Sequence, residues 1–163
     1  MKILFLDIDG VLNNHNSKTM YLSGDDTKYG IDDYNLQQLF RIINECGCKI
    51  VWSTNWRNHP DNWEWGTDKN RYKSQFPKIR NLLKDYTHED KYAPHKHGSL
   101  KAFDIAGWIQ NHKEEMQGGC IAILDDMSTQ KLDSYGICFF QTDSNYGLTK
   151  EIADNIIAFY KAH

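Results

Sequence analysis

Short apolar runs that end in polar or acidic residues recur along the chain and limit the folds open to it. The clearest are KILFLD (2–7), KIVWS (49–53) and CIAIL (120–124), and GICFF (136–140) is a fourth. Runs this short, rich in β-branched and aromatic residues, are typical of strands that are covered on both faces. The sequence therefore predicts four buried strands.

Segments with helical periodicity separate these runs. Apolar residues recur at helical spacing in 35–46, 77–86, 100–113 and 148–160, whereas 87–98 reads as a polar loop. Buried strands that alternate with amphipathic helices predict an α/β fold. We expect a three-layer sandwich with a mostly parallel, Rossmann-like sheet.

The length suits one domain. The chain has 163 residues, and no linker, internal repeat or low-complexity segment divides it, so we expect a single domain over 1–163. Residues 13–34 are expected to form a flap or a plain connecting loop, and 55–98 a small insertion. These segments leave room only for small caps over a site.

Charge and hydropathy limit the possible partners. The formal net charge of −3 argues against a nucleic-acid-binding field over the whole surface, although a local basic groove stays compatible with it. The first residues do not resemble a signal peptide, and no run reaches the roughly 18 apolar residues that a membrane helix needs. We expect a cytoplasmic protein with no membrane partner and no obligate protein partner.

Polar residues with metal- and phosphate-binding chemistry follow three of the predicted strands. They are Asp7, Asp9, Ser53, Thr54, Asn55, Asp125 and Asp126. In parallel sheets, ligands bind beyond the carboxyl ends of the strands, so these side chains are expected to meet. Several carboxylates at one edge repel each other, and a hard divalent cation such as Mg²⁺ relieves that repulsion. Solvated loop acids and helix caps would explain a single aspartate, but they explain the whole set poorly.

Four motifs resemble those of the haloacid dehalogenase-like (HAD) phosphohydrolases. DIDGV (7–11) resembles their first motif, Asp-x-Asp-Gly-x, and Thr54 is similar to the Ser/Thr that ends their second strand. Lys101 fits the lysine of the third motif, and ILDD (123–126) resembles the acidic fourth motif. The resemblance covers essentially the whole chain.

A narrower likeness is to the compact HAD domains of bacterial and phage RNA-repair proteins. Four stretches carry it: STNWR (53–57), SLKAFDIAGWI (99–109), ILDD (123–126) and QTDSNYGLT (141–149).

The resemblance implies roles for the acidic residues. Asp7 would be the nucleophile that forms an aspartyl-phosphate, and Asp9 the general acid and base. The Asp7 carboxylate, the Asp9 backbone carbonyl and Asp126 would hold Mg²⁺, while Asp125 would orient the site. Which of Asp125 and Asp126 binds the metal directly stays open.

The resemblance also implies how the phosphoryl group is bound. Thr54 and the backbone amide of Asn55 would contact its oxygens, and Lys101 would neutralise charge. Arg57 is the candidate for a further substrate phosphate contact. Three alternatives stay open: Ser53 in place of Thr54, and Lys91 or Lys96 in place of Lys101.

The function that these features predict is a Mg²⁺-dependent phosphomonoesterase. Its favoured substrate is a nucleotide or a polynucleotide end, because aromatic and basic residues alternate in 55–73. Those tryptophans could equally form the core of a small subdomain, and a small metabolite such as a sugar phosphate is the alternative substrate. The non-enzyme alternatives are a domain that only binds phosphate and a phosphoacceptor of the receiver type, whose acids occur in a different order along the chain.

Overall fold

The structure is a computed structural model of the chain. It describes residues 1–16, 30–58, 76–94, 100–127 and 137–163. The middle of the expected flap at 13–34 and most of the aromatic segment at 55–73 lie outside these residues.

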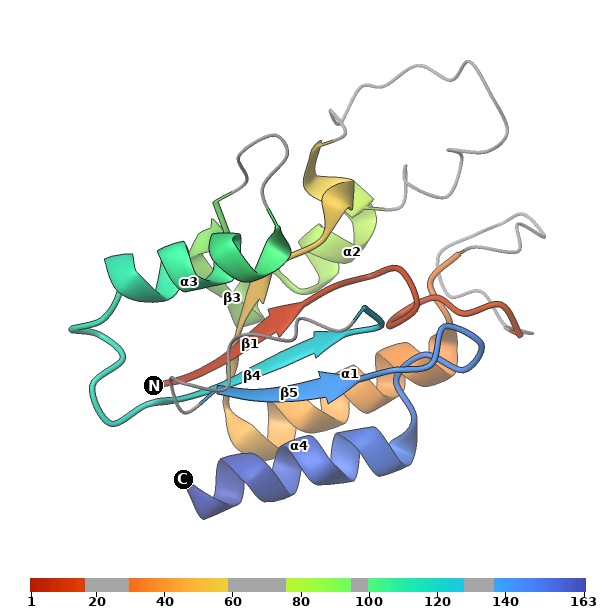
Figure 1. The fold of residues 1–163 in the computed structure, drawn as a ribbon. Helices are drawn as coiled ribbons and strands as arrows, with labels where there is room; N and C mark the ends of the chain where they lie inside the picture. The colour runs from red at the N-terminus through yellow and green to blue at the C-terminus, as the bar shows by residue number, and fades with distance from the viewer. Residues whose placement is uncertain (17–29, 59–75, 95–99, 128–136) are drawn as a thin grey trace.

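A parallel sheet forms the centre of the described part of the chain (Figure 1). Its five strands are β1 (Lys2–Leu6), β2 (Lys49–Trp52), β3 (Thr87–Tyr92), β4 (Cys120–Asp125) and β5 (Ile137–Gln141). They lie in the order β3-β2-β1-β4-β5, and neighbouring strands of this sheet pair in parallel. The predicted α/β class with a parallel sheet is confirmed.

Helices cover both faces of the sheet. The α-helices are α1 (Asp33–Cys46), α2 (Phe76–Leu82), α3 (Lys101–Asn111) and α4 (Lys150–Ala162), and the short 3₁₀ segments are η1 (Asn55–Asn58) and η3 (Lys84–Tyr86). Figure 1 shows α1 and α4 side by side on one face and α3 on the other. No helix in the described ranges is both long and apolar enough to cross a membrane.

Local signals explain where α1 begins and ends. The Asp32 carboxylate accepts a hydrogen bond of 2.9 Å from the backbone N–H of Asn35, which satisfies one of the free donors at the helix start. Gly47 ends the helix in the left-handed conformation, with φ 64°. Thr149 caps α4 in the same way as Asp32 caps α1.

The strand β3 corrects the expectation of a polar loop at 87–98. Its sequence, THEDKY, has no apolar run, and among its residues only His88 is buried. As an edge strand it pairs with β2 alone, and it leaves that register at a bulge. An edge strand needs less apolar surface than a central one, which explains why the pattern missed it. The predicted helix over 77–86 is also interrupted: α2 ends at Leu82, and η3 follows.

The side chains of β1 alternate between two apolar clusters. Leu4 and Leu6 pack in the cluster that includes α1 and α4, whereas Ile3 and Phe5 pack against residues of α3. Since successive side chains on a strand point to opposite faces, Asp7, the next odd-numbered residue, belongs on the α3 side. The fold therefore directs this carboxylate toward the start of α3.

Candidate active site

The strand register brings Asp7 and Asp125 together. Leu6 pairs with Leu124, and the Asp7 N–H continues that register with a bond of 3.1 Å to the Leu124 carbonyl. Asp125 ends β4 as Asp7 follows β1, so the two carboxylates lie next to each other on the α3 face. Both are almost completely buried, with 6% and 0% of their surface exposed.

Lys101 joins these two carboxylates. Its Nζ lies 2.6 Å from Asp7 Oδ2 and 2.5 Å from Asp125 Oδ2. Burial alone would lower the pKa of Lys101, but the charges of Asp7 and Asp125 outweigh burial and raise it. The first residue of α3 is therefore a fixed cation against both acids. Among the alternatives, Lys91 lies on β3, and Lys96 is outside the described residues.

Asp126 completes a cluster of three carboxylates. Asp7, Asp125 and Asp126 each offer an oxygen, and these oxygens lie within 4.8 Å of one another. Burial, followed by the charge of Asp7, raises the pKa of Asp125 to about 6. The same two causes raise the pKa of Asp126. Without a further cation beside Lys101, the cluster therefore tends to take up protons.

Three carboxylates are a donor set that fits a hard divalent cation. They differ in how many of their oxygens already accept hydrogen bonds. Asp125 accepts bonds on both oxygens, from Lys101 Nζ and from the Met127 N–H. Asp7 is similarly held, by Lys101 and by the Ile8 N–H. Within the described ranges, the Asp126 carboxylate accepts a hydrogen bond only from its own backbone N–H. Its oxygens are thus the most available to a cation.

Gly10 allows the turn after β1 to approach this cluster. It has φ 66°, and a Cβ atom added to it would lie 2.4 Å from Oδ2 of Asp126. A side chain at this position would therefore occupy the space of the carboxylate. Two side chains hold the turn: Thr142 donates to the Gly10 carbonyl across 2.7 Å, and Asn13 Oδ1 accepts from the Gly10 N–H across 2.8 Å.

The Asp9 side chain does not belong to the acid cluster. Trp56 Nε1 donates to its Oδ2 across 2.9 Å, and Asn13 Nδ2 donates to its Oδ1 across 3.1 Å. Trp56 is completely buried in η1. Neither Trp56 nor Asn13 was predicted to act on Asp9. The only available signals were the STNWR stretch that contains the tryptophan and the closeness of Asn13 to the first motif.

Two hydroxyl groups follow β2 beside Asp7. The Ser53 N–H bonds the Leu6 carbonyl across 2.9 Å, which continues the register and sets Ser53 next to Asp7. The Ser53 hydroxyl is buried and has no hydrogen-bond partner in the described part of the structure. Thr54, also fully buried, accepts the Trp56 N–H on Oγ1 across 3.3 Å.

Two further predicted substrate contacts lie in η1. Asn55 begins this segment and is exposed. The backbone of Arg57 belongs to it as well, while the Arg57 side chain lies outside the described residues.

The comparison with protein families agrees with this arrangement. Residues 3–153 match the family described as the HAD domain in Swiss Army Knife RNA repair proteins. No curated protein and no solved structure matches the chain. Because the family match spans nearly the whole sequence and includes every residue of the acid cluster, the chain belongs to this family of HAD domains.

Proposed function

We propose that the protein is a Mg²⁺-dependent phosphomonoesterase that acts through an aspartyl-phosphate at Asp7, with a polynucleotide end as its substrate. Membership of the HAD family supports phosphatase chemistry in general. The observation that carries the proposal is the meeting of Asp7, Asp125 and Asp126 within 4.8 Å beside the Lys101 ammonium group.

In the first step, an oxygen of Asp7 attacks the phosphorus of the substrate. The bond from Asp7 to phosphorus forms while the bond from phosphorus to the ester oxygen breaks. Asp9 gives its proton to the departing oxygen, which leaves as an alcohol. The hydrogen bonds from Trp56 and Asn13 support this role, because they orient the Asp9 carboxyl group and hold it apart from the acid cluster.

In the second step, water attacks the phosphorus of the aspartyl-phosphate. Asp9, now ionised, takes a proton from that water, and the bond from Asp7 to phosphorus breaks. Inorganic phosphate leaves, and the Asp7 carboxylate is restored. Asp9 regains the proton that it gave in the first step, so the cycle closes.

Asp7, Asp126 and the backbone carbonyl of Asp9 would hold the cation, and Asp125 would orient the site. Within the described residues, the Asp126 carboxylate is bonded only by its own backbone N–H, which supports its assignment as a direct ligand, whereas Asp125 accepts bonds from Lys101 and Met127. When bound, Mg²⁺ would stabilise negative charge on the transferring phosphoryl group. Lys101 adds a second positive charge at the same place.

The phosphoryl oxygens would contact a hydroxyl group at the end of β2 and the backbone amide of Asn55. For Thr54, the bond that Oγ1 accepts from Trp56 leaves its own proton available to donate. For Ser53, the buried hydroxyl beside Asp7 has no hydrogen-bond partner among the described residues, which supports the same role. Arg57 stays the candidate for a contact to another substrate phosphate.

A polynucleotide end is the favoured substrate because the matching family is described as a domain of RNA repair proteins. The test is phosphate release from RNA and DNA oligonucleotides with 3′- or 5′-phosphates, mononucleotides and sugar phosphates. Each is assayed with Mg²⁺ and with EDTA, for wild type and Asp7→Asn. We expect release that needs both Mg²⁺ and Asp7 and is fastest on oligonucleotides. Faster release from a sugar phosphate would contradict the substrate, and release by Asp7→Asn would contradict the mechanism.

A further inference from the structure

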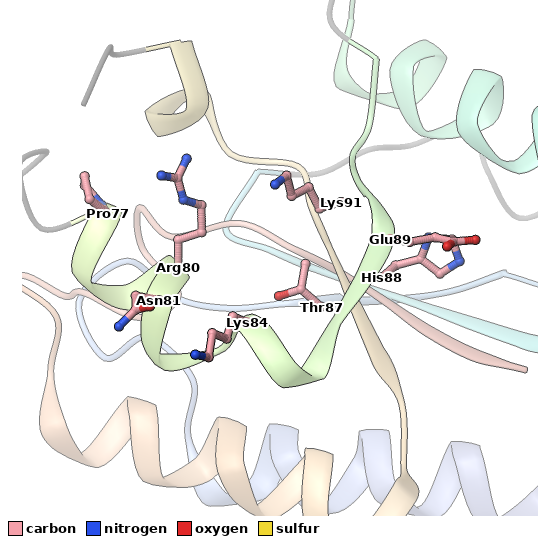
Figure 2. Close-up of a pocket in the computed structure, with 8 residues that line it drawn as sticks. All are labelled: Pro77, Arg80, Asn81, Lys84, Thr87, His88, Glu89 and Lys91. Atoms are coloured by element: carbon pink, nitrogen blue, oxygen red, sulfur yellow. The ribbon is translucent and has the colours of Figure 1, made fainter. Parts of the chain in front are cut away.

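We propose that a basic pocket along the edge strand β3 binds backbone phosphates of the substrate strand whose terminal phosphate lies at Asp7. This inference rests on the proposed function and names a second contact surface for its substrate. The pocket has a volume of about 360 Å³ and lies between α2, η3 and β3 (Figure 2). Its lining residues are Pro77, Arg80, Asn81, Lys84, Thr87, His88, Glu89 and Lys91.

Positive charge dominates the pocket. The lining contains three cationic side chains, those of Arg80, Lys84 and Lys91, and one carboxylate, that of Glu89. In Figure 2, Lys91 points from β3, the strand that also carries Thr87, toward Arg80 on α2. A polyanion would find charge and hydrogen-bond donors on both walls. This local excess stands out on a chain whose formal net charge is −3.

Carboxylates of the described residues do not neutralise the lysines of the pocket. In the described ranges, neither Lys84 nor Lys91 forms an ion pair with a carboxylate, and Lys91 Nζ lies 5.7 Å from the centre of the Tyr92 ring. On the face formed by α1 and α4, by contrast, cations are paired. Three examples are Arg41 and Lys150 with Asp154, and Lys161 with Glu45. Unpaired lysines can exchange their counterions for phosphates, which favours binding of a nucleic-acid strand.

One cation of the pocket is fixed in place. Arg80 Nη1 donates to the Tyr92 hydroxyl across 3.2 Å, and its guanidinium lies 5.8 Å from the centre of the Phe76 ring. A guanidinium held in this way loses less side-chain entropy when it binds a phosphate. Arg80 therefore gives the pocket a preorganised contact, while the two lysines adapt to the strand.

The pocket extends along β3, away from the proposed phosphoryl site. Its lining runs from Thr87, which begins β3 and pairs with Ile50, to Lys91 near the carboxyl end of the strand. Tyr92 pairs with Trp52, and the Ala93 N–H bonds the Trp52 carbonyl across 3.1 Å, so β3 ends level with β2, two residues before Thr54. One strand separates β3 from β1, which sets them about 10 Å apart. A phosphate in the pocket would therefore belong to a different nucleotide from the one at Asp7. A mononucleotide or sugar phosphate cannot occupy both places.

The test compares two double variants that each remove two positive charges. Lys84→Ala/Lys91→Ala changes the pocket, and Lys113→Ala/Lys161→Ala removes exposed lysines that lie elsewhere. Both are made in Asp7→Asn protein, so that substrate is bound without turnover. Binding of fluorescent single-stranded RNA and DNA with terminal phosphates is measured by anisotropy over a range of salt concentrations.

We expect the pocket variant to weaken binding about tenfold at low salt and to reduce the slope of log K against log salt by about 1.4, since each lost phosphate contact removes about 0.7. The control should change binding by less than about twofold. Equal effects of the two variants, or an acidic peptide that competes as well as the oligonucleotide, would overturn the inference. If binding responds as expected but the wild-type protein releases no phosphate from the same oligonucleotides, the result would contradict the proposed function alone.

Discussion

The indole Nε1 of Trp56 donates a hydrogen bond of 2.9 Å to Oδ2 of Asp9, 47 residues earlier in the chain. Asn13 holds the other oxygen of the same carboxylate. A carboxylate held on both oxygens keeps one orientation while its proton leaves and returns. The indole therefore acts through Asp9, as a positioning residue for the proposed acid and base.

Replacing Trp56 by Phe should impair proton transfer to the leaving group. A well-placed general acid contributes about 10²–10⁴-fold, so we expect kcat/KM on an alkyl phosphate to fall by about 10–100-fold. The loss should be much smaller on an aryl phosphate, whose leaving group needs little protonation. The measurement is kcat/KM for both substrates, because this ratio reports the step in which the leaving group departs.

Trp52→Phe is the matched control for that variant. Trp52 is as deeply buried as Trp56 and belongs to the same apolar cluster. Both variants should lose about 1–3 kcal/mol of unfolding free energy. If Trp52→Phe produced the same difference between alkyl and aryl phosphates, the effect would come from the damaged core and not from Asp9.

Lys101→Met should leave the carboxylates of Asp7 and Asp125 without their shared cation. Removal of one member of a buried ion pair costs about 3–5 kcal/mol, so the metal-free variant should unfold at clearly lower denaturant concentration at neutral pH. Added Mg²⁺ should restore part of the loss, because the cation replaces the missing charge. Urea unfolding with Mg²⁺ and with EDTA checks this, and Lys101→Arg, which keeps the charge, is the control. A Mg²⁺ effect no larger than in wild type would contradict the account.

Gly10→Ala should abolish most cation binding. The added Cβ would meet Oδ2 of Asp126 at 2.4 Å, in a backbone conformation with φ 66°. Gly47→Ala is the matched control, since Gly47 has φ 64° and no atom within 4 Å of the added Cβ. The two variants should share a backbone cost of about 1–2 kcal/mol. Calorimetric titration with Mg²⁺ should show the loss of affinity only in Gly10→Ala, and equal affinities would refute the close approach.

Cation binding should release protons near pH 6. The pKa of Asp125 is raised to about 6 by burial and by Asp7, and that of Asp126 is raised by the same causes, whereas in the unfolded chain both return to about 3.9. The folded metal-free protein therefore binds more protons than the unfolded chain between about pH 4 and pH 6, and these groups lower its stability as the pH rises through that window. Mg²⁺ competes with the same protons, so its apparent affinity should rise over this range.

Titration of Mg²⁺ at two pH values in two buffers of different ionisation enthalpy measures this release. The heat should depend on the buffer at about pH 6 and much less at about pH 8. Asp125→Asn, which cannot titrate, is the control and should release fewer protons. Heats that are independent of the buffer at both pH values would mean that the cluster is already ionised before the metal binds.

The sequence predicted those elements whose signal is local. Central strands such as CIAIL are covered on both faces, so their apolar runs identify them, and the helical spacing of apolar residues in 35–46 identifies α1. The placement of ligands beyond the carboxyl ends of strands led to Asp7 and Asp125, and the resemblance to the HAD phosphohydrolases led to Lys101; the structure brings the three side chains together. β3 was not predicted, because this edge strand pairs with one neighbour only and its sequence has no apolar run. The hydrogen bond between Trp56 and Asp9 was not predicted either, because it joins two segments far apart in the sequence, and residue spacing does not indicate such a contact.

The most direct test of the central claim is a search for a phosphoryl group on Asp7. Wild-type protein is mixed with Mg²⁺ and excess 3′- or 5′-phosphorylated oligonucleotide, quenched in acid within one turnover, and digested for mass spectrometry. The proposed mechanism predicts that the peptide containing Asp7 gains the mass of one phosphoryl group, and that the gain is absent in Asp7→Asn and in EDTA. Phosphate release without any such modification, or with the modification on another residue, would contradict the account.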